Sequence, residues 1–126
     1  GKWEGSGLAL VVDAEPEVRA VTASLMEFMG YEVITAQDGL EALELFEQNR
    51  DRLGLILMDM SMPRMNGLEA AREILQRSPS LPIVLCSGYP AEIYGLETVP
   101  LSGFPQKPYR KADLARTLQN ALRSKG

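Results

Sequence analysis

The sequence contains no histidine, a single cysteine and no long apolar run. Without histidine, the 126 residues cannot by themselves supply a histidine general base, a Ser-His-Asp or Cys-His nucleophile, or a histidine-ligated zinc site. The lone thiol, Cys86, excludes an internal disulfide and is typical of a reducing compartment, so we expect a cytoplasmic domain. We expect no membrane contact, because no apolar run approaches the roughly 20 residues that cross a bilayer.

Positive charge is also scarce. The 13 Lys and Arg residues face 17 Asp and Glu residues, which gives a net charge of −4. Nucleic-acid binding depends on clustered Lys and Arg that neutralise phosphates, so we expect no nucleic-acid partner. The apolar fraction of 45% and the charged fraction of 24% are ordinary for a globular protein. A chain of this length buries roughly two thirds of its unfolded surface, which is enough for one folded, monomeric domain.

Apolar runs without polar interruption alternate with segments of helical periodicity, a pattern that predicts an α/β fold with a parallel sheet. Asp38 and Glu41, and again Asn66 and Glu69, have the spacing of a helix capping box. The stretch from Tyr89 to Pro100 is ambiguous: Ala91–Glu97 fits a short helix, but Pro90, Gly95 and Pro100 weaken that prediction. The strands are expected at Leu8–Val12, Tyr31–Thr35, Leu55–Met58, Pro82–Cys86 and Leu101–Phe104, and the helices at Pro16–Met29, from Asp38 to beyond Phe46, at Asn66–Arg77 and at Lys111–Arg123.

The first expected helix carries an apolar stripe that should pack on the sheet. Its members are Val18, Val21, Leu25, Phe28 and Met29. Leu43, Phe46 and Ala42 are the inward residues of the second helix.

Polar side chains stand where the expected strands end. Asp13 follows the first strand, Asp59 the third and Ser87 the fourth, while Lys107 follows the fifth. Ligands of open parallel sheets bind at the carboxyl ends of the strands, and the first and third strands should be neighbours. A single strand-terminal aspartate is usually a turn or cap residue. Four such residues at one sheet edge instead predict a site in which carboxylates hold Mg²⁺, Lys107 and Ser87 bind phosphoryl oxygens, and Asp59 attacks phosphorus.

Four segments resemble a known family in this order: VVDAEPEVR, LILMDMSMPRMNGLE, VLCSGYP and GFPQKPY. From about Leu8 to Leu122 the chain resembles a response-regulator receiver domain of the CheY-like kind. The resemblance implies a flavodoxin-like, doubly wound (βα)5 fold with a five-stranded parallel sheet in the order 2-1-3-4-5. It also implies that Asp59 accepts a phosphoryl group from a phosphohistidine of a histidine kinase or a histidine phosphotransfer domain.

The resemblance assigns further roles residue by residue. Lys107 and Ser87 match catalytic positions, and Ser87 and Phe104 match the family's switch pair. Asp13, Asp59 and the backbone carbonyl of Ser61 match the Mg²⁺ ligands.

One departure from the family concerns the metal site. The family usually has two acidic residues after its first strand, whereas this chain has Asp13 followed by Ala14. We expect weakened Mg²⁺ binding and slower phosphorylation, because a carboxylate ligand is missing; Glu15 is a further candidate ligand. The alternative is a degenerate receiver that acts as a phosphorylation-independent interaction module.

The segment between Ser87 and Phe104 is the second departure, because it is about two residues shorter than the family pattern. The domain organisation expected is a linker or expression remnant at 1–7, the receiver at 8–123 and a tail at 124–126. The phrases around Ser87 and Lys107 resemble receivers of hybrid sensor histidine kinases. A free-standing regulator is the other context, and the domain itself is a phosphoacceptor in either case.

Overall fold

Strands and helices alternate along the part of the chain that the computed structural model describes, which is residues 7–60, 62 and 64–86. The elements are β1 (Leu8–Val12), α1 (Pro16–Phe28), β2 (Glu32–Ala36), α2 (Gly39–Gln48), β3 (Leu53–Asp59), α3 (Gly67–Arg77) and β4 (Ile83–Cys86). The predicted bounds agree to within two residues at most ends. Among the described residues, no helix is both long and apolar enough to cross a membrane.

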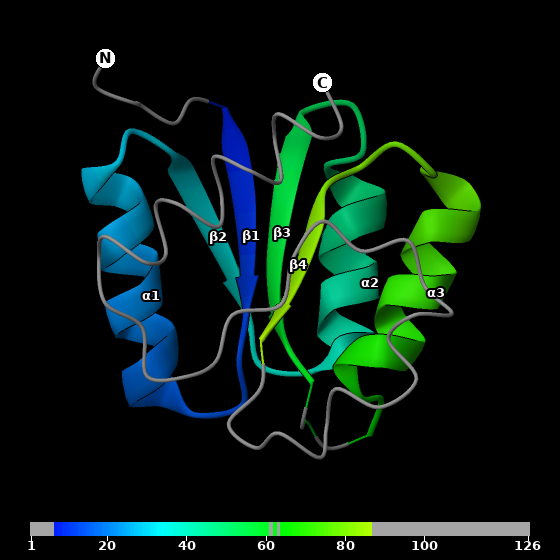
Figure 1. The fold of residues 1–126 in the computed structure, drawn as a ribbon, viewed down its shortest axis with the longest axis horizontal. Helices are drawn as coiled ribbons and strands as arrows, with labels where there is room; N and C mark the ends of the chain where they lie inside the picture. Colours follow the sequence, from blue (N-terminus) through cyan, green and yellow to red (C-terminus); the bar gives the residue numbers. More distant parts are fainter. Residues whose placement is uncertain (1–6, 61, 63, 87–126) are drawn as a thin grey trace.

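The four strands form one parallel sheet in the order β2-β1-β3-β4 (Figure 1). Val12 of β1 pairs with Ala36 of β2 on one side and with Met58 of β3 on the other. This arrangement confirms the flavodoxin-like α/β fold and the first four positions of the predicted order. The expected strand at 101–104 and the expected helices at 91–97 and 111–123 lie outside the described residues.

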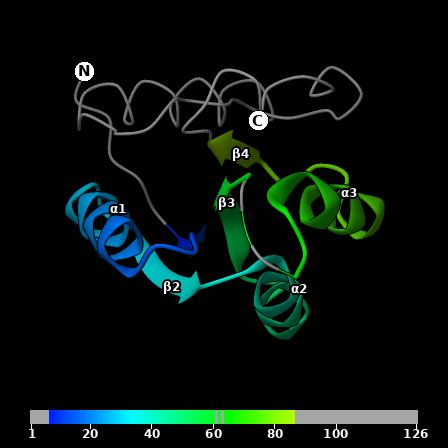
Figure 2. The ribbon, with the colours of Figure 1, turned by 90° about the horizontal axis from the view of Figure 1, so that it is seen from below.

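Helices cover both faces of the sheet. Figure 2 shows α1 on one face, and α2 and α3 on the other. Because successive side chains of a strand point to opposite faces, each strand feeds two cores. Leu10 and Val12 pack with α2 and α3, while Ala9 and Val11 pack on the α1 side. Continuous apolar strands therefore follow from burial on both faces, as the sequence predicts.

The first turns of α2 and α3 are capped by the residues that the sequence predicts. Asp38 accepts a hydrogen bond from the Glu41 N–H at 2.9 Å. At α3 the capping box is complete: Asn66 accepts from the Glu69 N–H at 2.9 Å, and the Glu69 carboxylate accepts from the Asn66 N–H at 3.4 Å. At α2 the Glu41 carboxylate accepts from the N–H of Gln37 rather than of the cap residue.

The predicted inward face of α1 is only partly correct. Met29 is buried and Leu25 packs against the core, but Val21 and Phe28 are 60% and 72% exposed, whereas Thr22 and Met26 are the buried residues within the helix. Among the described elements α1 packs on β1 and β2, and the core formed there includes Met26, Met29 and Leu25 but neither Val21 nor Phe28. The predicted inner residues of α2 fare better, since Ala42 and Phe46 are fully buried and Leu43 is partly buried.

Candidate functional site

Asp59 is the last residue of β3 and is buried, with only 4% of its surface exposed. It pairs in register with Cys86, the last residue of β4. The backbone is held in place where it leaves the strand, because the Met60 N–H donates a hydrogen bond to the Cys86 carbonyl at 2.9 Å. The Met60 carbonyl in turn accepts from the Gly67 N–H at 3.0 Å, which fastens the start of α3 to the end of β3.

Asp13, the residue after β1, is buried to a similar degree, with 3% exposed. Its N–H donates to the Ala36 carbonyl of β2 at 3.1 Å, so the strand pairing continues to this residue. Val12 pairs with Met58, so Asp13 and Asp59 each come directly after one member of a paired couple. The two strands are neighbours and lie roughly 4.8 Å apart. Strand alternation assigns both side chains to the α1 side of the sheet, so the predicted convergence of these two aspartates is supported.

The loop after β1 is organised around Asp13. The Asp13 carboxylate accepts a hydrogen bond from the Glu15 N–H at 2.9 Å, and the Asp13 carbonyl accepts from the Arg19 guanidinium at 2.7 Å. Glu15 is exposed, and Ala14 between them is partly exposed. The Glu15 backbone N–H is thus in direct contact with the Asp13 carboxylate.

Gly67 meets the backbone of the candidate acceptor. A Cβ at this position would overlap the Asp59 carbonyl oxygen and lie 3.0 Å from both the Asp59 carbonyl carbon and the Met60 Cα. Contacts below 3.4 Å already force a neighbour to shift. Only glycine lets α3 begin this close to the end of β3, and this close approach fixes the main chain on either side of Asp59.

A third buried aspartate, Asp38, stands at the same edge of the sheet, after β2. The sequence predicts it as a helix cap but gives no signal for its second partner, Arg64, which lies 26 residues further along the chain. The Arg64 guanidinium binds Asp38 Oδ2 through Nε at 3.0 Å and also through Nη2. The Glu41 N–H, helped by Arg64, holds the pKa of Asp38 below its ordinary value of 3.8.

The donor set at this edge fits a hard cation with few protein ligands. Mg²⁺ takes one or two carboxylates together with waters or phosphate oxygens. Asp13 and Asp59 supply two such carboxylates. Within residues 7–60, 62 and 64–86, no group of three or more acidic, cysteine or histidine side chains could hold a metal ion. Asp38 is engaged instead by Arg64 and the α2 backbone.

The remaining predicted site residues are not placed by the structure. Ser61, Ser87, Phe104 and Lys107 all lie outside the described residues. Ser87 follows Cys86 directly in the sequence, and Cys86 pairs with Asp59. The structure thus brings Asp13 and Asp59 to one edge and leaves the roles of the other four as predictions.

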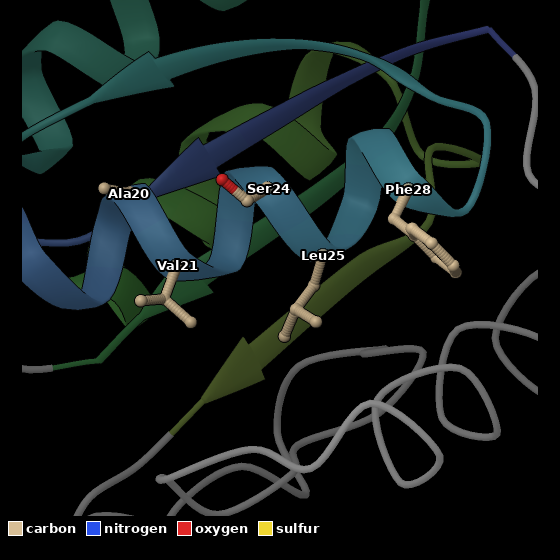
Figure 3. Close-up of a pocket in the computed structure, with 5 residues that line it drawn as sticks. All are labelled: Ala20, Val21, Ser24, Leu25 and Phe28. Atoms are coloured by element: carbon tan, nitrogen blue, oxygen red, sulfur yellow. The ribbon is translucent and has the colours of Figure 1, made fainter.

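A separate hollow of about 440 Å³ lies along α1, away from the aspartates (Figure 3). The described residues that line it all belong to α1: Ala20, Val21, Ser24, Leu25 and Phe28. These five side chains offer one hydroxyl and otherwise apolar groups.

Comparison with known proteins decides the family. Residues 9–119 match the response regulator receiver domain. The chain belongs to that family. Among curated proteins, this receiver is similar to the sensor kinase CckA of Brucella abortus, with 31% identity over 94% of the chain and 13% of the kinase. It is also similar to the autoinducer sensor kinase/phosphatase CqsS of Vibrio cholerae, with 40% identity over 79% of the chain and 15% of that protein.

Solved structures give the same family. The receiver superimposes on the chemotaxis protein CheY4 of Vibrio cholerae with a TM-score of 0.84 and 30% identity, over 94% of this chain and the whole of that one. The chain spans only about a seventh of the length of the two sensor kinases. Receiver domains work in two-component signalling, interact with histidine kinases or phosphotransfer proteins, and generally bind Mg²⁺ at their acidic pocket.

Proposed function

We propose that this receiver accepts a phosphoryl group on Asp59 from the phosphohistidine of a histidine kinase or a histidine phosphotransfer domain. The observation that carries the proposal is the burial of Asp59 at the carboxyl end of β3, on the same rung as the position of Asp13. In the transfer, a carboxylate oxygen of Asp59 bonds to phosphorus while the bond between phosphorus and the donor imidazole nitrogen breaks. The electron pair of that bond stays on the imidazole.

Asp13 and Asp59 are the residues of this chain that would hold Mg²⁺, and the resemblance adds the Ser61 carbonyl. When bound, the metal neutralises charge on the transferring phosphoryl group. Lys107 and Ser87 are proposed to bind its other oxygens, with Ser87 and Phe104 as the switch pair.

Ala14 is proposed to make the Mg²⁺ site weak. At about 4 Å and an effective dielectric constant of about 20, two unit charges interact by about 4 kcal/mol. Desolvation cancels much of such a gain. We therefore expect Ala14→Asp to tighten Mg²⁺ binding about tenfold, and Glu15→Gln to leave it unchanged because the Glu15 side chain is exposed. Calorimetric titration of Mg²⁺ into the wild type and the two variants measures both affinities.

The phosphorylation test uses acetyl phosphate and Mg²⁺, followed by intact-mass analysis. We expect the mass of one phosphoryl group on the wild type and none on Asp59→Asn. A gain that persists in Asp59→Asn would contradict the assignment of the acceptor.

The second candidate is a phosphorylation-independent interaction module, and Ala14 is the observation that favours it. This candidate predicts that the wild type takes no phosphoryl group at any Mg²⁺ concentration, while the Ala14→Asp variant is phosphorylated. This outcome separates a pocket that has lost its metal from one that never carried phosphoryl chemistry.

The similarity to CckA and CqsS supports a third element of the proposal, that this receiver works as one cytoplasmic module of a sensor kinase chain. We assign residues 8–123 to the domain, with 1–7 as linker and 124–126 as tail, and we expect a monomer. Limited proteolysis should trim the two ends and leave 8–123, and sedimentation should give the mass of one chain.

A further inference from the structure

Asp38 uses both of its carboxylate oxygens, each on a different part of the chain. Oδ1 accepts the Glu41 N–H and so caps α2, while Oδ2 receives the Arg64 guanidinium. The carboxylate is 4% exposed and the arginine 57% exposed. A buried carboxylate that binds a guanidinium through two nitrogens makes a directional contact, unlike an exposed ion pair.

Arg64 holds an uncommon backbone conformation, with φ at +66°. Within the described residues it is the one non-glycine residue with a positive φ. Glycine or asparagine adopts this conformation more readily than arginine does. The turn alone thus does not account for an arginine here, whereas the contact with Asp38 does.

The neighbours of Arg64 are tied to α2 and to β3 by backbone contacts. The Gly39 N–H, in the first turn of α2, donates to the Met65 carbonyl at 3.2 Å. A Cβ on Gly39 would lie 2.9 Å from the Met65 Cβ, so the two segments are packed without spare room. Further back, Met60 is bonded to both Cys86 and Gly67. Arg64 and Met65 are therefore held against the start of α2 by the ion pair and a backbone hydrogen bond, and Gly67, two residues on, is held against the backbone of Asp59 and Met60.

We infer that Arg64, through its ion pair with Asp38, is a positioning residue for the acceptor site: it fixes to the start of α2 the turn at Arg64 and Met65, which leads into Gly67 and its close contact with the Asp59 backbone. The inference rests on the proposed function of Asp59. Arg64 acts through Asp38 and the backbone and does not itself touch the phosphoryl group.

A positioning role and a purely electrostatic role of Arg64 predict opposite changes in Mg²⁺ affinity when Arg64 is replaced. Removing a positive charge near an acidic pocket raises its affinity for a cation. Loosening the backbone that carries one of the two carboxylates lowers that affinity, because a displaced ligand binds less well. The sign of the change therefore identifies the role when Arg64 is removed, whereas loss of the Asp38 charge lowers Mg²⁺ affinity on either view.

The variants are Arg64→Gly, which suits the backbone but removes the ion pair, and Asp38→Asn, which keeps a good helix cap but removes the charge. The matched control is Arg52→Gln, which breaks the exposed ion pair between Arg52 and Glu32. Three measurements are made: calorimetric titration of Mg²⁺ alone, the rate of phosphorylation by acetyl phosphate, and hydrogen exchange of the Gly39 amide.

We expect Arg64→Gly and Asp38→Asn each to weaken Mg²⁺ binding and slow phosphorylation by about tenfold, the scale seen when a supporting partner of a metal site is lost. The double variant should be no worse than either single one, because both remove the same link. Gly39 should exchange faster, and Arg52→Gln should match the wild type throughout.

Unchanged Gly39 exchange in Arg64→Gly would overturn the inference by itself, as would tighter Mg²⁺ binding or additive effects in the double variant. If the wild type takes no phosphoryl group, the proposed function fails, and Mg²⁺ titration and amide exchange still decide whether the ion pair positions the site.

Discussion

Replacing Gly67 with alanine should destabilise the domain by about 2–3 kcal/mol. The new methyl group would overlap the Asp59 carbonyl oxygen and stand 3.0 Å from two backbone carbons, and none of these atoms belongs to a flexible side chain. The start of α3 must then move away from β3. Such overpacking costs about 1–3 kcal/mol, and the hydrogen bond from Gly67 to Met60 contributes about 1 kcal/mol more.

Two effects oppose this loss. Alanine restricts the unfolded chain, which stabilises the folded state by about 0.4–1 kcal/mol. Alanine also favours a helix, although less in its first turn than in its interior. The remaining loss is a large part of the total stability of about 5–15 kcal/mol that is usual for a domain, and corresponds to a fall in Tm of roughly 10 °C.

Urea unfolding followed by circular dichroism measures the change, and Gly54→Ala is the matched control. Gly54 lies in β3 and is exposed, and a Cβ there would meet only the Leu8 carbonyl oxygen, at 3.8 Å. This variant should be stabilised by about 0.5–1 kcal/mol, because glycine is a poor strand residue. A loss below about 1 kcal/mol for Gly67→Ala, with the same slope on urea, would refute the claim that the close approach is rigid.

Three other outcomes are expected. Asn66→Ala should lose about 1 kcal/mol of unfolding free energy in the same urea assay, because it removes the cap of α3. Since the pKa of Asp38 is depressed on folding, its contribution to stability is present above pH 3.8 and is lost as pH falls through the lower, folded value; acid titration of Asp38→Asn should therefore show a shallower loss below pH 3.8 than the wild type. The Cys86 thiol, fully buried, should react with an aromatic disulfide reagent no faster than the domain opens, and a rapid native-state reaction would contradict its burial.

The strands were predictable where an uninterrupted apolar run in the sequence coincides with a strand that is buried on both faces. Uninterrupted apolar runs located β1 to the residue and β4 to within one residue. The prediction placed β3 at Leu55–Met58, whereas the strand runs from Leu53 to Asp59. Gly54 interrupts the apolar run and lies where the register shifts between Leu53 and Leu55, and Asp59 is polar, so neither residue is typical of a strand although both belong to β3.

Asp13 and Asp59 were predictable as site candidates because their positions depend only on where two strands end and on those strands being neighbours. The inward face of α1 was predictable only in part, because periodicity gives the spacing of an apolar stripe and not which of its members meet the sheet. Arg64 was not predictable. Its partner, Asp38, precedes another helix, and the two residues meet only because β2 and β3 both flank β1 and their following loops share one edge.

The strand order also has a consequence for folding. β1 pairs with β3, so residues 8–12 must find residues 53–59 across an intervening βα unit. Pairings between distant parts of a chain form slowly, because the loop between them must close first. Asp13 and Asp59 belong to the two partners of that pairing. A nascent or partly unfolded chain that holds α1, β2 and α2 without the β1–β3 pairing has therefore not yet brought Asp13 and Asp59 together, and the site forms only when those two strands pair.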